Sequence, residues 1–233
     1  IRVAEKTAEC VPEPSCFHGP IRKYPDLFLT GAVAPDIFYY YLAGPGSADI
    51  QKLSHVFHSH DAASLKPLLR LLFSGDRENP KALAFAAGIG CHLVTDTVFH
   101  PLIYYFSGLE SLHPGADTRH RQLETALDIR FLDAGGPSCA TALVRVMGRP
   151  GLFRTDLIRF MQTLFDLKPG QWDRHLKAAM AAHRIALTLF SNPFAGRSMR
   201  MLNAVGGNRL AQYEALFYPP RFYAGCGVPA LFT

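Results

Sequence analysis

The segment Phe85–Pro101, which reads FAAGIGCHLVTDTVFHP, constrains the fold more than any other part of this 233-residue chain. Its apolar residues surround three polar ones, His92, Asp96 and His100, which recur at steps of four. On an α-helix, residues four apart lie about 40° from one another around the axis, so the three side chains share one face. Burying them without partners is costly, whereas a divalent metal ion satisfies all three. The segment therefore predicts a buried helix that carries metal ligands.

A histidine-rich segment, Ser54–Asp61 (SHVFHSHD), favours metal binding over the alternative that these are ordinary hydrogen-bonded core or surface residues. It places His55, His58 and His60 within six positions, and seven of the ten histidines fall between His55 and His120. Packing alone does not account for such enrichment, but metal coordination does. A ligand set of imidazoles with some carboxylates suits zinc better than calcium or magnesium.

A second predicted helix, from Asp117 or Thr118 to about Asp133, carries His120 and Glu124 at i and i+4 on one face. Helical bundles build multi-metal sites from such pairs on facing helices. The predicted ligands form two sets: His92, Asp96 and one histidine of the 55–60 cluster for a first ion, and His100, His120 and Glu124 for a second. Two such ions can split a phosphoester, because one activates water and the other stabilises developing charge.

The rest of the chain also has a helical pattern, since apolar residues recur at intervals of three and four and never alternate for long. We expect an all-α fold with a single domain over residues 1–233, in which the metal site lies within 30–130 and C-terminal helices within 138–217 complete the bundle. A broken helix is predicted over 23–42, with a turn at Ala34-Pro35 and its second segment at 37–42. The other predicted helices occupy 1–9, 62–73, 138–147, 155–167, 171–190 and 208–217. Loops are predicted over 11–20 and 107–115. The opening helix is predicted to begin at Asn79-Pro80 and to kink or end at His100-Pro101.

The composition of the chain limits the kinds of binding partner that we expect. The chain is 48% hydrophobic and 18% charged, which argues against disorder. Its net charge of +5 favours an anionic substrate or lipid surface, but no basic run interleaved with aromatic residues predicts nucleic-acid binding. Apolar stretches are interrupted before the roughly 20 residues that a membrane span needs, so we expect no transmembrane segment.

The cysteines and the start of the chain bear on localisation. The five cysteines form no C-x-x-C pair and their number is odd, so we expect reduced thiols and favour the cytoplasm. No signal peptide opens this sequence. It also lacks an initiator methionine, and a processed start would instead fit a secreted protein.

These segments together resemble the zinc-dependent phospholipase C family, and in particular its uncharacterised bacterial branch. The resemblance covers about the first 135 residues and rests on GAVAPDIFYY at 31–40, FHSHD at 57–61, ALAFAAGIGCHLVTDTVFHP at 82–101 and HRQLETALD at 120–128. It implies an all-α bundle with zinc ions in a cleft and a metal-dependent phosphoric ester hydrolase activity. It also implies a phosphate-ester substrate, for which the head group of a phospholipid is one candidate. Peripheral contact of the protein with a membrane would follow from such a substrate.

The resemblance also implies roles for individual residues. Asp36 would orient or deprotonate the attacking water. His92, Asp96 and one cluster histidine would bind the first zinc; His60 is favoured, with His58 and His55 as fallbacks. His100, His120 and Glu124 would hold the second zinc. Asp96 would also reach a third zinc, which in the family uses a histidine or amine near the N-terminus that residues 1–9 do not provide. We therefore expect two zinc ions and leave a third open.

Two other functions compete with this one. The doublet His60-Asp61 resembles that of HD-type metal phosphohydrolases, although that reading leaves His100, His120 and Glu124 without a role. Alternatively, the metals are structural and the helical body is a non-catalytic interaction module. In that case Asp36 would only cap the helix predicted at 37–42.

Overall fold

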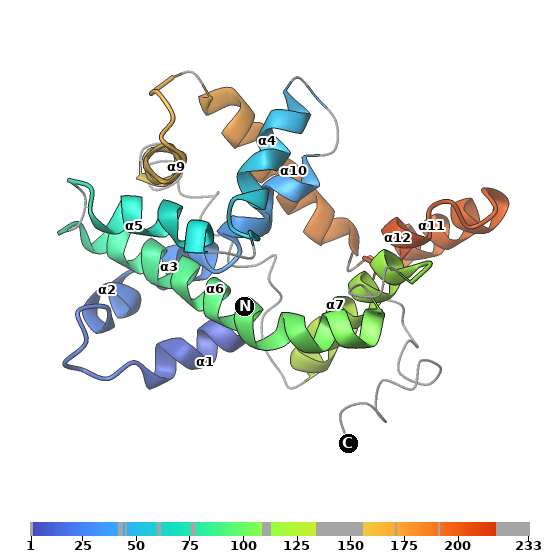
Figure 1. Ribbon diagram of the computed structural model, residues 1–233, viewed down its shortest axis with the longest axis horizontal. Coiled ribbons are helices and arrows are strands. Elements are labelled where there is room, and N and C mark those ends of the chain that lie inside the picture. Colours follow the sequence, from blue (N-terminus) through green and yellow to red (C-terminus); the bar gives the residue numbers. More distant parts are fainter. Residues whose placement is uncertain are drawn as a thin grey trace. The chain divides into compact units, whose positions relative to one another are not determined.

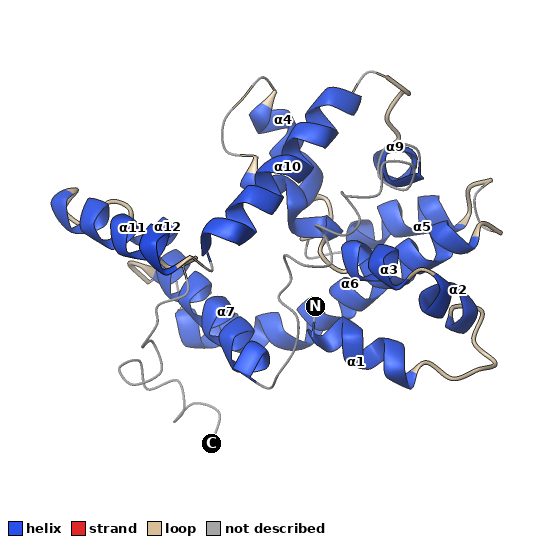
Figure 2. Cartoon of the chain, turned by 180° about the vertical axis from the view of Figure 1, so that it is seen from behind, coloured by secondary structure: helices blue, strands red, loops and turns tan. Residues whose placement is uncertain are grey.

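The computed structural model describes residues 2–41, 44, 46–59, 62–75, 78–108, 113–133, 156–170, 172–190 and 192–217. These residues form helices joined by turns and short irregular segments, and no strand occurs among them (Figure 2). The predicted all-α fold class is confirmed. The helix predicted at 138–147 lies outside the described residues.

The chain divides into two compact units, Ile1–Thr95 with Ser138–Ile185 and Asp96–Pro137 with Ala186–Thr233. The first unit contains the first part of α6 (Pro80–Ser107), most of α10 (Asp173–Phe190) and the following elements: α1 (Arg2–Cys10), α2 (His18–Lys23), α3 (Pro25–Gly31), η1 (Ala34–Tyr40), α4 (Ser47–His55), η2 (Ala62–Leu65), α5 (Lys66–Leu72) and α9 (Ile158–Phe165). The second unit contains the rest of α6 together with α7 (Ala116–Asp133), α11 (Pro193–Val205) and α12 (Ala211–Glu214). Figure 1 labels the α-helices among them.

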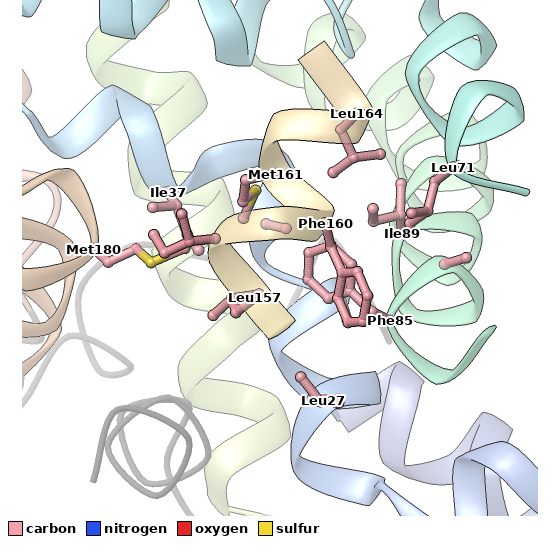
Figure 3. Packing of buried hydrophobic residues seen from close by; sticks show 14 of the residues in the cluster. Leu27, Ile37, Leu71, Phe85, Ile89, Leu157, Phe160, Met161, Leu164 and Met180 are labelled. Carbon is pink, nitrogen blue, oxygen red and sulfur yellow. The ribbon is translucent and has the colours of Figure 1, made fainter. Parts of the chain in front are cut away.

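The core of the first unit forms where α6 and α9 pack together (Figure 3). Apolar residues recur on α9 at steps of three and four, and this spacing gives the helix one buried face. Phe160 from that face stacks on Phe85 of α6, with ring centroids 5.8 Å apart. Phe165, at the end of α9, meets the ring of Phe38 edge-on at 5.5 Å. These contacts hold η1 and α6 in place, and both elements carry candidate metal ligands.

The close approach of α3 and α6 depends on glycine. A Cβ at Gly88 of α6 would collide with the Phe28 carbonyl oxygen and would lie only 2.7 Å from the Ala32 backbone nitrogen. Gly31 of α3 faces the α6 backbone in the same way. The two backbones therefore touch, and the end of α3 is brought beside His92, one turn after Gly88.

We expect Gly88→Ala to lower the free energy of unfolding by roughly 2–3 kcal/mol, because the new methyl group would meet backbone atoms that cannot move aside cheaply. Gly90→Ala is the matched control on the same helix: its Cβ would lie 3.8 Å from Leu68 Cδ2, an ordinary contact, and alanine favours the helix. Urea titration of both variants measures the difference. Equal stability of the two variants would contradict the close approach.

Of the two outcomes expected at His100-Pro101, a kink or an end, the structure excludes the end. α6 continues through Pro101 to Ser107. A proline inside a helix removes one hydrogen bond, and the flanking apolar residues continue the helical pattern beyond it. By length and composition alone, α6 could also cross a membrane, but core helices of soluble proteins pass the same test.

Other helix boundaries also differ from the predictions. α2 occupies part of the predicted loop at 11–20, because Pro20 falls in its first turn, where proline is tolerated. α4 and α11 were not predicted at all. The helix predicted at 208–217 is reduced to the single turn of α12.

Candidate metal centre

Three side chains of the first unit converge into a candidate metal site, which we call the first triad: Asp36, His58 and His92. Asp36 lies in the first turn of η1, His58 in the turn after α4, and His92 on α6. One ligand atom from each residue lies within 4.8 Å of the other two. Asp36 Oδ1 and His58 Nε2 are 3.2 Å apart. Two imidazoles and a carboxylate at this separation form the donor set of a zinc site.

Backbone carbonyls orient both histidines of the first triad. His58 Nδ1 lies 2.9 Å from the Ser54 carbonyl oxygen, and His92 Nδ1 lies 3.0 Å from that of Ala32. A carbonyl oxygen only accepts, so each Nδ1–H donates and each ring presents Nε2 as its lone-pair nitrogen. Metal-binding histidines are commonly held by such an outer hydrogen bond. His92 is also only 8% exposed, so its ring is shielded from water, whereas Asp36 is part exposed.

Three side chains of the second unit form a second triad: His100, His120 and Glu124. His100 comes from α6, and the other two lie one turn apart on α7. Glu124 Oε1 lies 3.1 Å from His120 Nε2 and 3.6 Å from His100 Nε2. The two imidazole rings stack with centroids 5.6 Å apart, and the Tyr104 ring packs against both. Both Nε2 atoms therefore point at one carboxylate oxygen.

The electrostatics of the second triad favour a bound cation. Desolvation raises the pKa of Glu124, but hydrogen bonds and charge from His100 and His120 outweigh it and bring the pKa to about 2. The carboxylate is therefore ionised at neutral pH, as a ligand must be. Burial and the charges of Asp96 and Glu124 raise the pKa of the Tyr104 hydroxyl. Negative charge thus gathers around the two histidines.

Asp96 lies beside the second triad. Its Oδ1 is 3.6 Å from His100 Nδ1, on the opposite side of the ring from Glu124. A carboxylate behind a metal-binding imidazole orients the ring and raises its basicity. The expectation that Asp96 shares an ion with His92 stays a prediction.

Among the clustered histidines, the structure brings His58 to Asp36 and His92. The resemblance favours His60 as the ligand of the first zinc. His60 lies outside the described residues, so this assignment stays a prediction. His55 Nδ1 lies 3.5 Å from the Tyr39 hydroxyl, which also lies 3.2 Å from His58 Nδ1. Tyr39 therefore links two of the three clustered histidines.

The alternative role of Asp36 as a helix cap is wrong. The N-cap of η1 is Val33, and no side chain caps this element. Pro35 occupies one of its first positions, which places Asp36 within the first turn, where its carboxylate reaches His58. The acid/base role of Asp36 stays a prediction.

His183 on α10 is not among the ligands predicted from the sequence, and the structure places it near Asp36 of the first triad. It is 3% exposed and its ring packs on Tyr40 with centroids 4.7 Å apart. Burial lowers its pKa to about 4, while the charge of Asp36 acts to raise it. Neither ring nitrogen has a hydrogen-bond partner among the described residues. No spacing in the sequence relates residue 183 to residue 36, so only the fold could show this.

The donor chemistry of both triads fits zinc. Each triad offers two imidazole nitrogens and one carboxylate oxygen, the set found in catalytic sites that keep a fourth position for water. In the first triad the lone-pair nitrogens are fixed by backbone carbonyls. In the second triad His120 Nδ1 is buried without a hydrogen-bond partner among the described residues, so stacking on His100 and Tyr104 holds that ring.

An all-α protein with two triads of this kind belongs to the class of helical metalloproteins whose donor sets suit zinc hydrolases. Residues 2–188 match the family described as zinc dependent phospholipase C, and the chain belongs to that family. The resemblance noted from the motifs is thereby confirmed, and zinc dependence follows from it. Searches of curated proteins and of solved structures give no significant match.

Proposed function

We propose that this protein is a zinc-dependent phosphoesterase that hydrolyses a phosphodiester, with one zinc ion on each triad. The observation that carries the proposal is that α6 contributes one histidine to each of two separate His–His–carboxylate groups, His92 to the first and His100 to the second. A single structural metal would need only one such group. Membership of a phospholipase C family supports the same reaction class.

Zinc, when bound, supplies Lewis acidity and lowers the pKa of a coordinated water. The residues of the chain then divide the remaining work. His58 and His92 hold their Nε2 atoms in place through backbone carbonyls. Asp36 contributes one carboxylate oxygen to the first triad, and because its side chain is part exposed, the carboxylate can also orient the attacking water and accept its proton. Glu124 brings a negative charge to the second triad, which balances the cation there.

The substrate class follows from charge and family. A net charge of +5 favours an anionic ester, and the family name points to a phospholipid or related phosphate ester. A phosphodiester with a lipid or small-alcohol leaving group fits both. Phosphomonoesters are the next candidates.

The test is hydrolysis by zinc-loaded protein across a panel that contains bis(p-nitrophenyl) phosphate, p-nitrophenyl phosphate, p-nitrophenylphosphorylcholine and phospholipids in mixed micelles. We expect turnover of at least one phosphodiester, its loss after removal of zinc with a chelator, and its recovery when zinc is restored. Full zinc occupancy without cleavage of any compound in the panel would refute the proposal.

A further inference from the structure

Helix α11 presents large apolar side chains to solvent. Phe194 is 73% exposed, Met201 71% and Val205 90%, and Leu202 beside them is 59% exposed. At 100° per residue, Phe194, Met201 and Val205 lie within about 40° of one another around the axis, with Leu202 about 60° further on. These four side chains lie on one side of the helix, with Ser198 between Phe194 and Leu202, and we call them the α11 apolar face.

The opposite side of α11 packs against α12 through small and polar residues. Asn203 is buried, donates from Nδ2 to Glu214 Oε2 at 2.5 Å, and accepts from the Leu210 backbone N–H at 2.9 Å. Gly196, on the same side, lies close to Phe217. In both Figure 1 and Figure 2, α11 and α12 lie side by side. This arrangement reverses the usual amphipathic helix, which turns its large apolar residues toward the protein.

The charges of α11 indicate what covers this face. Its sequence, PFAGRSMRMLNAV, contains Arg197 and Arg200 and no acidic residue. The Arg197 guanidinium lies over the ring of Phe194, 5.9 Å from its centroid, at the border of the apolar face. Arg197 borders the apolar face and Arg200 lies further round, on the polar side of the helix. An apolar face combined with arginines on the polar side is typical of a helix that lies in the interface of an anionic bilayer.

The family match does not account for the α11 apolar face. Residues 2–188 match the family, whereas α11 begins at Pro193. This face is therefore a feature of the chain outside the matched zinc-binding region.

We propose that α11 docks this protein on an anionic lipid bilayer, with Phe194, Met201, Leu202 and Val205 in the boundary between head groups and acyl chains and Arg197 and Arg200 against lipid phosphates. The proposal does not rest on the phosphoesterase activity, because docking needs only the apolar face and its two arginines.

The test is co-sedimentation with vesicles of phosphatidylcholine alone and of phosphatidylcholine mixed with phosphatidylglycerol. The wild-type chain should bind the mixed vesicles more tightly. Met201→Asp and Val205→Asp should each weaken this binding about tenfold or more, because each places a charge on the inserted face. Arg197→Gln and Arg200→Gln should each weaken it about fivefold on the mixed vesicles.

Phe73→Asp is the matched control, because Phe73 is 79% exposed but lies in the first unit, away from α11 in sequence. It should bind vesicles like the wild type. Circular dichroism checks that each variant keeps its helix content, and sedimentation is run with zinc-loaded and with chelated protein so that docking is separated from catalysis.

Three outcomes would overturn the proposal. In the first, the wild-type chain binds neither kind of vesicle. In the second, Phe73→Asp weakens binding as much as Met201→Asp does, so that added charge and not the α11 face is responsible. In the third, gel filtration shows a wild-type dimer that Met201→Asp converts to a monomer while vesicle binding is absent, which would assign the face to a second copy of the chain.

Discussion

Asp36→Asn is expected to lower phosphodiester hydrolysis by about 100-fold or more. The substitution keeps the size of the side chain but removes the negative charge that lies 3.2 Å from His58 Nε2. An amide is a poor proton acceptor, and loss of a positioned acid/base typically costs two to four orders of magnitude. An amide is also a weaker metal ligand than a carboxylate, so zinc at the first triad should bind about 10- to 100-fold more weakly.

Asp49→Asn is the control for this variant. Asp49 lies on α4, is exposed and pairs with Lys52 at 2.8 Å, so the same chemical change there should leave activity and zinc content unaltered. Rates are compared at saturating zinc, and zinc affinity is measured by competition with a chromophoric chelator. Activity of Asp36→Asn within twofold of the wild type would contradict the role of this carboxylate. Lost activity with wild-type zinc affinity would restrict Asp36 to acid/base chemistry.

Glu124→Gln is expected to lower the zinc content by one ion per chain and activity by about 100-fold. Both His100 Nε2 and His120 Nε2 point at Glu124 Oε1, so the substitution removes the only carboxylate within that triad. Without its charge, the second triad should no longer hold zinc against dilution. The first triad, in the other unit, should keep its ion.

Glu9→Gln is the control, because Glu9 is exposed and forms a surface ion pair with Lys6 within α1. Elemental analysis after gel filtration measures the zinc retained. Glu124→Gln also distinguishes the proposed enzyme from an HD-type phosphohydrolase, in which the doublet His60-Asp61 would bind the metal. That doublet lies outside the described residues. Loss of zinc from Asp61→Ala with full retention by Glu124→Gln would support the HD-type alternative.

The sequence was most informative where polar residues interrupt an apolar helical pattern. The step of four between His92, Asp96 and His100 predicted one helix that carries all three residues, and α6 is that helix. The pair His120 and Glu124 was predicted on one face of a helix, and in α7 the two side chains lie within 3.1 Å of each other. Such pairs follow from helix geometry alone, so no tertiary information is needed to find them.

The sequence was less informative where the position of a side chain depends on how a turn packs. Spacing alone could not choose among His55, His58 and His60, because the direction of each ring depends on how the turn after α4 packs. The hydrogen bond from His58 to the Ser54 carbonyl, four residues earlier, is one such detail. The nearness of His183 to Asp36 depends on long-range packing and has no sequence signal.

Some missed features did have a signal. Asn192-Pro193 is an N-cap followed by proline at the first helical position, and Asn192 Oδ1 accepts from the backbone nitrogens of Phe194 and Ala195. That pair would have predicted the start of α11. The requirement for glycine at position 88 had no signal, because the backbone that it meets belongs to residues 28–32, far away in sequence.

The most direct test of the two-site account is the number of zinc ions in protein purified without chelator. Elemental analysis, set against protein concentration from amino-acid analysis, should give at least two zinc ions per chain, one for each triad. Dialysis against a chelator should remove them together with the activity. One zinc ion per chain, or none, in protein that is fully folded would contradict the account.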